Sequence, residues 1–483
     1  MIDVRPVGYV IGLLVAALGV TMFAPLLADL MAGNGHWPVF LESAVITILI
    51  GGLVALACQN GVSSGLSIRQ TFLLTTMVWL ALPLFGSIPF VLGGSALNFT
   101  DGFFEAMSGL TTTGSTVISD IESLPEGLKL WRGVLQWLGG IGIIVVAMVF
   151  LPELRVGGMQ IFRSEGFDTM GKILPRATEI SSRISVIYVG LTLACAVTYS
   201  ALGMNSFDAI IHAMTTIATG GFANYDSSFG QFGSGVEYAG VVFMMLAALP
   251  FVRYVQLISG GGATPILKDS QIRTFFIVAA VLVVLISVWQ WSLSAEMTET
   301  AFRKSLFNVV SILTGTGYAS ADYMQWGPFA VTMFFFIGLI GGCAGSTACS
   351  VKIFRYQLLF ASIKAQINRI HSPSGIFTPR YQGRPVGEDV LNSVMAFFVA
   401  FMVAIGVVGV ALALTGLDFI TSISGAATAL ANVGPGLGNE IGPAGNFAGL
   451  NDAAKWILAI AMLVGRLEIM AVFTIISWHF WRA

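Results

Sequence analysis

Four short segments rich in glycine and threonine interrupt the long apolar stretches of this 483-residue chain. They read TTGST at 112–116, ATGGF at 218–222, TGTGY at 314–318 and NVGPG at 432–436. Irregular backbone is tolerated at membrane depth only inside protein or along a water-filled cavity. Glycine permits conformations that turn carbonyl oxygens toward a common centre. The four segments therefore predict a ring of main-chain carbonyls that replaces the water around a cation.

The atoms predicted to face this cation are main-chain oxygens at and around one glycine in each segment. The residues are Thr112, Thr113, Gly114, Ala218, Thr219, Gly220, Thr314, Gly315, Thr316, Gly317, Asn432, Val433 and Gly434. The predicted ion ligands are the carbonyls of Thr113, Thr219, Thr316 and Val433. For a single segment, packing glycines and ordinary helix caps are the simpler interpretation. Four segments at matching places favour the ion site.

Each polar segment is expected to follow a short helix that enters the membrane halfway. The predicted helices are 99–111, 206–217, 299–313 and 418–431, and Asp101, Asp208, Thr300 and Asp418 are the predicted N-caps. A helix of about 12 residues is roughly 18 Å long. Its C-terminal end carries partial negative charge and points to the predicted cation. The glycines aligned by this pattern are Gly114, Gly220, Gly317 and Gly434, at spacings of 106, 97 and 117 residues.

Long apolar spans flank every short helix, so the chain reads as four repeated units after a two-span beginning. The predicted spans are 7–31, 38–58, 70–94, 130–152, 184–203, 236–259, 274–295, 328–359, 390–416 and 453–481. The predicted domains are 1–60 with two helices and the pore units 61–155, 156–262, 263–365 and 366–483. The fold class is thus an all-α polytopic membrane protein, with four tandem units around a pseudo-fourfold pore.

Composition supports this class, since 56% of the residues are hydrophobic and 10% are charged, against roughly 25% charged in soluble domains. With the N-terminus inside, 17 of the 23 Lys and Arg fall in inner segments, as the positive-inside rule requires. The chain contains no metalloprotease or nucleotide-binding motif, and its four cysteines have no metal-ligand spacing. The chain is therefore predicted not to be an enzyme, to bind no cofactor of its own and not to bind nucleic acid.

Two further features lie on the predicted path of the ion. The stretch IGLIGGCAGSTACSVK at 337–352 breaks a span with Gly341, Gly342 and Gly345, which indicates a hinge or a close packing site. Arg466 lies within the last span, where a charge costs about 2.5–3.5 kcal/mol on insertion scales and is usually functional. Glu468 is two residues away and on another helix face, so a direct pair with Arg466 is not expected.

The stretches TDGFFEAMSGLTTTGST (100–116), GGCAGST (341–347) and ANVGPGLG (431–438) together resemble the Trk/Ktr/HKT potassium transporters, TrkH type. The likeness includes QWLGGIGIIV (136–145) and AKWILAIAMLVGRLE (454–468) and runs over nearly the whole chain. It implies potassium as the ion. It also implies a gate made of Gly341, Gly342, Gly345, Ser346, Thr347 and Lys352, with Arg466 as a barrier in the pore. The chain departs from the family where Ala348, Cys349 and Ser350 replace glycines.

The resemblance further implies a homodimer with one pore per subunit in a bacterial inner membrane, and cytoplasmic nucleotide-binding regulatory subunits of the TrkA type. Two transport mechanisms remain open at this point. One is a channel-like potassium permease, and the other is a potassium symporter coupled to protons or sodium. Broken helices suit both mechanisms. Four units in one orientation favour the fixed pore, because alternating access usually pairs two inverted halves.

Overall fold

The computed structural model describes residues 3–61, 66–93, 97–146, 158–159, 177–262, 264–294 and 298–482. Within these ranges the protein is all-α apart from one small hairpin, β1 (Arg380–Tyr381) with β2 (Arg384–Pro385). Eight helices in the described residues are long and apolar enough to cross a membrane, and two bent helix pairs raise the number to ten. The predicted class of a multi-span membrane protein is confirmed.

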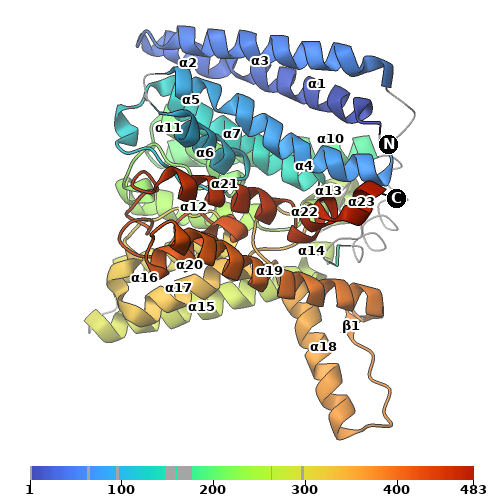
Figure 1. Ribbon diagram of the computed structural model, residues 1–483. Coiled ribbons are helices and arrows are strands. Elements are labelled where there is room, and N and C mark those ends of the chain that lie inside the picture. Colours follow the sequence, from blue (N-terminus) through green and yellow to red (C-terminus); the bar gives the residue numbers. More distant parts are fainter. Residues whose placement is uncertain are drawn as a thin grey trace.

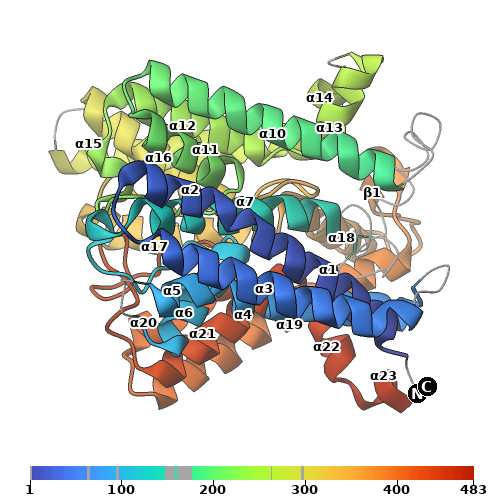
Figure 2. The same ribbon diagram turned by 90° about the horizontal axis from the view of Figure 1, so that it is seen from above.

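The first helices form a layer at one side of the molecule, where α1 and α3 lie side by side (Figures 1 and 2). This layer consists of α1 (Arg5–Thr21), α2 (Phe23–Ala32), α3 (Trp37–Cys58) and the 3-10 turn Gln59–Gly61. Gly12 faces Gly51 and Ala55 so closely that a Cβ atom on this glycine would collide with backbone. Small residues allow this close packing of membrane helices without a polar contact.

The four units that follow repeat one order of elements. The first has α4 (Ile68–Gly86), α5 (Ile88–Leu92), α6 (Phe99–Leu110), the 3-10 turn Ile121–Ser123 and α7 (Glu126–Val145). The second has α10 (Ala177–Ala201), α11 (Ser206–Ile217), the 3-10 turn Ser228–Gln231, α12 (Ser234–Ala247), α13 (Phe251–Gln256) and the π-turn Leu257–Gly261. The predicted boundary between these two units, at 155/156, lies outside the described residues.

The third unit has α14 (Thr264–Lys268), α15 (Ser270–Ser294), α16 (Glu299–Thr314), the 3-10 turn Tyr323–Trp326, α17 (Gly327–Ile340) and α18 (Ile353–His371). The fourth has α19 (Glu388–Leu414), α20 (Phe419–Ala431), α21 (Asp452–Arg466), α22 (Ile469–Ile476) and α23 (Trp478–Arg482). The short helices α6, α11, α16 and α20 match the four predicted half-helices to within one residue at each end.

The units close into a ring through helix contacts that repeat. Helix α7 packs on α11, α12 on α16, α17 on α20 and α21 on α6. Each contact joins the second span of one unit to the short helix of the next unit. The last of them brings the fourth unit back to the first, although the two are far apart in the sequence. This cyclic order positions the four polar segments around one centre.

The helix caps differ from the predicted ones in three of the four units. The N-caps are Asn98, Asn205 and Thr298, whose side-chain oxygens accept from the main-chain N–H three residues later. Asp101 and Asp208 therefore lie in the first turn, where a carboxylate suits the positive end of the helix. Thr300 is likewise inside its helix, and the predicted cap Asp418 is confirmed. The sequence contains two capping residues two or three positions apart at these helices, and the earlier one is used.

Three of the predicted spans are broken. The helix pair α12 and α13 bends by 87°, and α21 and α22 bend by 107°. The span 328–359 is broken where its glycine-rich stretch predicted, and it consists of α17, a non-helical loop over residues 341–352, and α18. The bend between α12 and α13 contains Pro250, which cannot donate a backbone hydrogen bond and ends a helix.

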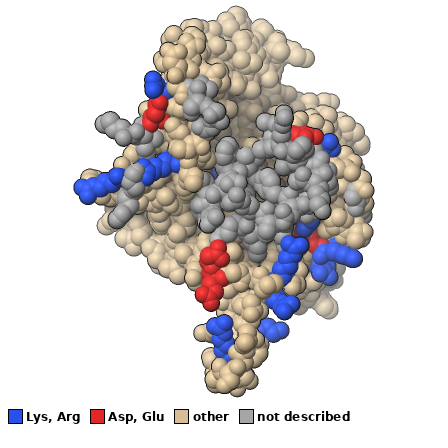
Figure 3. All heavy atoms as spheres, turned by 90° about the vertical axis from the view of Figure 1, so that its right-hand side faces the viewer, with Lys and Arg blue, Asp and Glu red and all other residues tan. Residues whose placement is uncertain are grey.

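A projecting element, here called the arm, consists of α18 and the β1–β2 hairpin (Figure 1). Both ends of the chain lie at this same end of the molecule (Figure 1). Figure 3 looks onto that end and shows Lys and Arg side chains gathered around the arm. The exposed basic residues there include Lys364, Arg369, Arg380 and Arg384. Basic residues at this end agree with its predicted inner location.

Candidate functional site

The four polar segments, hereafter the filter segments, share one backbone conformation. In each, a main-chain N–H donates to the carbonyl five residues earlier, at the end of the short helix. The pairs are Thr113 to Ser108, Gly220 to Thr215, Thr316 to Ser311 and Val433 to Thr428. The residue before each donor has positive φ, between 49° and 75°, in Thr112, Thr219, Gly315 and Asn432. The residue after each donor also has positive φ, and it is a glycine in all four segments.

This conformation corrects the predicted alignment of the second segment by one residue. The glycines with equivalent φ are Gly114 (87°), Gly221 (77°), Gly317 (82°) and Gly434 (110°). Gly221 therefore takes the place predicted for Gly220. The equivalent carbonyls are those of Thr113, Gly220, Thr316 and Val433, so Gly220 takes the place of Thr219 in the predicted set of ligands. The ATGGF segment offers two adjacent glycines, and sequence alone does not distinguish which of them carries the positive φ.

The filter segments meet in a closed ring. A Cβ atom on Gly114 would collide with the Gly220 carbonyl, one on Gly221 with the Thr316 carbonyl, and one on Gly317 with the Val433 carbonyl. The ring closes because a Cβ atom on Gly434 would lie 2.8 Å from the Thr113 carbonyl oxygen. Each glycine thus lies against the equivalent carbonyl of the next segment. These contacts require glycine twice over, for the positive φ and for the space.

Side chains from neighbouring elements hold the ring in place. Gln136 of α7 donates to the Gly220 carbonyl at 2.6 Å and accepts from the Phe222 N–H at 3.1 Å. The Asn432 amide donates to Thr113 Oγ1 at 3.0 Å and to the Met462 carbonyl at 2.9 Å. These side chains are buried. Buried polar groups that are fully paired specify one arrangement of the chain around them.

On one side of the ring lies a cavity, here called the vestibule. All four glycines with positive φ line it, together with Arg132 and Asp226. The carboxylates of Asp120, Glu122 and Asp226 approach one another within 4.8 Å and are exposed. That all four glycines line one cavity independently supports the convergence of the filter segments.

A buried ion pair supports the wall of the vestibule. Glu105 of α6 accepts from Arg132 Nε at 2.8 Å, from the Thr116 hydroxyl at 3.0 Å and from the Val117 N–H at 3.0 Å. The Arg132 guanidinium also donates to the Ala223 carbonyl and lies 4.1 Å from the centre of the Phe222 ring. The pair therefore ties the first two filter segments together as they leave the ring.

Replacing Glu105 with glutamine should destabilise the protein strongly. The change leaves the buried Arg132 charge unpaired, which typically costs about 3–5 kcal/mol. We expect a lower thermal unfolding midpoint and less folded protein after detergent extraction. The exposed Glu122 offers the matched control, and Glu122→Gln should leave both quantities nearly unchanged. Equal unfolding midpoints for the two variants would contradict this role of the pair.

On the other side of the ring lies a smaller cavity, here called the inner cavity. Its lining includes Asn432 of the fourth filter segment, Cys349, Lys352, Arg466 and Glu468. Asn432 comes two residues before Gly434, which lines the vestibule. The two cavities therefore lie at opposite ends of the filter segments, and the 341–352 loop and Arg466 lie below the ring.

The 341–352 loop fits into the break between α12 and α13. The Cys343 N–H donates to the Ala248 carbonyl at 3.0 Å, and the Thr347 hydroxyl donates to the Ala247 carbonyl at 3.1 Å. The Phe251 N–H donates to the Gly345 carbonyl at 2.9 Å. The loop thus supplies hydrogen-bond partners for main-chain N–H and C=O groups that the break between the two helices leaves unpaired. Gly341, Gly345 and Lys352 have positive φ, and the side chains of Ser346, Thr347 and Lys352 are buried.

Arg466 and Glu468 have separate partners, as predicted. Arg466 donates to Cys349 Sγ at 2.7 Å and to the Gly139 carbonyl at 3.3 Å. Glu468 pairs with Arg355, and its carboxylate lies 3.8 Å from Lys352 Nζ. Arg466 is 4% exposed, and its Nε has no hydrogen-bond partner among the described residues. A buried guanidinium charge beside the inner cavity is suited to repel a cation.

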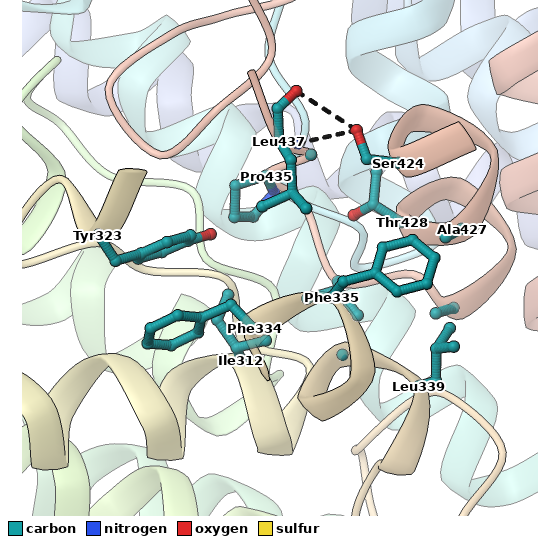
Figure 4. Close-up of a pocket in the computed structure, with 14 residues that line it drawn as sticks. Ile312, Tyr323, Phe334, Phe335, Leu339, Ser424, Ala427, Thr428, Pro435 and Leu437 are labelled. Atoms are coloured by element: carbon teal, nitrogen blue, oxygen red, sulfur yellow. Dashed lines mark hydrogen bonds between the residues drawn. The ribbon is translucent and has the colours of Figure 1, made fainter. Parts of the chain in front are cut away.

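A third cavity lies behind the fourth filter segment and away from the ring (Figure 4). Tyr323 stacks on Phe334 with ring centres 4.1 Å apart. Ser424 of α20 accepts from the Leu437 N–H at 2.9 Å and donates to its carbonyl at 3.3 Å, and these are the dashed contacts in Figure 4. This cavity therefore belongs to the packing that supports residues 435–437 from outside.

The sequence pattern missed Gln136, Glu105, Arg132 and the partners of Glu468. A polar or charged residue inside an apolar helix was the available signal for Gln136 and Arg132. Nothing in the sequence paired Glu105 with Arg132, which lies 27 residues later, or Glu468 with Arg355, 113 residues earlier. Of the predicted gate residues, Lys352 and Arg466 line the inner cavity together, and the others lie in the loop that precedes Lys352.

Comparisons with known proteins identify the same family over nearly the whole chain. A sequence model of the family described as "TrkH: Cation transport protein" matches residues 36–479. The chain is 42% identical to the Trk system potassium uptake protein TrkI of Halomonas elongata, over 99% of this chain and 97% of the relative. It is 35% identical to the Trk system potassium uptake protein TrkH of Escherichia coli K12, over 99% of each. The crystal structure of the potassium transporter TrkH from Vibrio parahaemolyticus covers all of both chains, with a TM-score of 0.91 and 33% identity.

Proposed function

Because this chain belongs to the TrkH family of cation transport proteins, we propose that it takes up potassium across a bacterial inner membrane through a channel-like pore. It is a multi-span membrane protein and not an enzyme. The observation that carries the proposal is the closed ring of four filter segments with four equivalent carbonyls. One permeation path per chain, around a pseudo-fourfold axis, follows from this ring.

In this mechanism the carbonyls of Thr113, Gly220, Thr316 and Val433 replace the water around a dehydrated potassium ion. The Gly220 oxygen already accepts from Gln136, but a carbonyl oxygen has a second lone pair that remains for the ion. The short helices end at the ring, so their C-terminal partial charges favour a cation there. The filter residues before and after these carbonyls set the backbone conformation.

The gate is proposed to be the 341–352 loop together with Arg466. Lys352 and Arg466 line the inner cavity. The other proposed gate residues of this loop are Gly341, Gly342, Gly345, Ser346 and Thr347. Opening then requires the loop to leave the break between α12 and α13 and Arg466 to move from the ion path. Helix α18, which is part of the arm, begins directly after the loop, so a partner bound to the arm can act on the loop.

We also propose that the protein works as a homodimer with cytoplasmic nucleotide-binding subunits of the TrkA type. The relatives are Trk system proteins by name, and the basic arm offers a projecting surface at the inner end (Figure 3). The proposed division into a two-helix domain and four pore units follows the repeated order of elements.

The acidic residues of the vestibule should make potassium uptake sensitive to outside pH. Burial raises the pKa of the Asp226 carboxyl, and the neighbouring charges of Glu122 and Asp120 raise it further. Asp226 therefore takes up a proton at a higher pH than an ordinary aspartate, whose pKa is about 3.8. As outside pH falls from 7 through this raised pKa, the vestibule loses negative charge. Uptake at low potassium should then fall on the order of twofold, because cation attraction is weaker.

The pH effect is checked with initial uptake rates in liposomes at low ionic strength. The Asp226→Asn variant should show a slower rate at pH 7 and a smaller change on acidification. Asp452 is exposed and does not line the vestibule, so Asp452→Asn should keep the full pH response. If the pH response of uptake is unchanged in Asp226→Asn, a group other than Asp226 is responsible for it.

The proposed function is tested with the purified full-length chain in liposomes, alone and with its regulatory subunit. Potassium-selective current should reverse at the potassium equilibrium potential, with no shift when the proton or sodium gradient is changed. A reversal potential that follows a second gradient would establish the symport mechanism instead. If no potassium moves either with the chain alone or with its regulatory subunit present, the proposed function itself is wrong.

A further inference from the structure

The thiol of Cys349 lies where the filter ring, the 341–352 loop and Arg466 meet. Its sulfur is 2.7 Å from Arg466 Nη1, 3.7 Å from the Thr112 hydroxyl and 3.7 Å from the Thr347 carbonyl. A Cβ atom on Gly315 of the third filter segment would lie 3.4 Å from Cys349 Cβ. Cys349 is 5% exposed and lines the inner cavity. The residue therefore contacts two filter segments and the charged side chain below them.

The contact between Cys349 and Arg466 matters because the other charged groups around the inner cavity leave Arg466 with few acceptors. Lys352 and Arg466 line the cavity, and Arg355 reaches Glu468 from α18. Glu468 is the acidic side chain among the residues that line it, and its carboxylate is taken by Arg355 and approached by Lys352. Arg466 has the Cys349 sulfur and the Gly139 carbonyl as its hydrogen-bond acceptors in the described residues. A buried guanidinium with few acceptors is held where those acceptors are.

We propose that Cys349 is a positioning residue that seats the Arg466 guanidinium beneath the filter and so keeps the pore closed. The sulfur accepts from Arg466 Nη1, and its contact with Thr112 links that bond to the first filter segment. Because Cys349 is part of the gate loop, withdrawal of the loop breaks the bond and releases Arg466 in the same movement. The inference rests on the proposed potassium pore and adds a residue that sets its closed state.

Single-channel recording of potassium current in liposomes tests this role with three substitutions at one position. Cys349→Ala and Cys349→Gly remove the acceptor and should raise open probability about tenfold or more, the factor expected from loss of one hydrogen bond to a charged group. Cys349→Ser keeps an acceptor and should remain close to the unaltered protein. Two variants without an acceptor keep the test valid if one of them fails to fold.

Cys343 provides the matched control because it is also a buried cysteine of the gate loop and packs in the apolar core. Cys343→Ala should leave open probability unchanged. The second readout is a double-variant cycle with Arg466→Ala, which a merely structural role of Cys349 would not satisfy. Cys349→Ala should add no further current once Arg466 has been removed.

The outcomes separate this inference from the proposed function. If the unaltered protein carries no potassium current, the proposed function fails first. If it conducts but Cys349→Ala and Cys349→Gly behave like the unaltered protein, the positioning role of Cys349 is wrong. The role is also wrong if the effects of Cys349→Ala and Arg466→Ala multiply independently, or if Cys349→Ser opens the pore as much as Cys349→Ala.

Discussion

Replacing Gly317 with serine should reduce potassium uptake at least about tenfold, the factor that corresponds to 1.4 kcal/mol. Gly317 has φ of 82°, a region that costs other residues roughly 1–2 kcal/mol. The added Cβ atom would also collide with the Val433 carbonyl and lie 3.0 Å from Pro435 Cδ. The Val433 oxygen must then move away from the ring. Sodium should compete better in the variant, because a distorted ring loses its fit to potassium.

The measurement is initial uptake of potassium and sodium into liposomes that contain equal amounts of folded protein. Gly406 of α19 is the matched control, since a Cβ atom there meets nothing within 4 Å and its φ is ordinary. Gly406→Ser makes the same chemical change in a membrane helix and should transport normally. Normal potassium selectivity in Gly317→Ser would show that the third filter segment does not contact the ion.

Replacing Arg466 with alanine should raise potassium conductance at least about tenfold in the absence of the regulatory subunit. At an effective dielectric constant of 20, two unit charges 4 Å apart repel by about 4 kcal/mol. Arg466 is buried beside the inner cavity with its charge uncompensated by Glu468, which pairs elsewhere. Its removal therefore lowers the barrier for a cation leaving the filter.

Arg369→Ala is the control for this experiment, because Arg369 is an exposed arginine near the end of α18. Both variants lose one positive charge at the inner half of the protein. The control should conduct like the unaltered chain at physiological ionic strength, where charges beyond about 8 Å are screened. Unchanged or reduced conductance in Arg466→Ala would place this arginine outside the ion path.

The sequence predicted the parts of this fold that depend on hydropathy and helix length. Ten apolar spans were expected, and the structure has eight continuous candidates and two bent pairs. The half-helix 206–217 was predicted with the boundaries of α11. These features depend on local composition, because a span needs about 20 apolar residues and a short helix needs a cap and a glycine.

The details that the sequence did not predict depend on tertiary contacts or on a choice between residues close together in the sequence. Gly220 and Gly221 are both compatible with the filter pattern, and only the backbone conformation selects Gly221. Asn98 and Asp101 are both capping residues, and the start of α6 selects Asn98. The break between α12 and α13 is stabilised by residues about 100 positions away in the gate loop, which no local pattern encodes.

The ring of filter segments also has a consequence for biosynthesis. Its closing bonds join the first and last units, from Asn432 to Thr113 and from Ser115 to Gly434, in each case across 319 positions of sequence. Such distant contacts form late, because the intervening loop must first be ordered. During translation the first three units are therefore in the bilayer before the fourth filter segment is present, and the ring is incomplete. The ring is complete only when the fourth unit has entered the membrane and packed against the first.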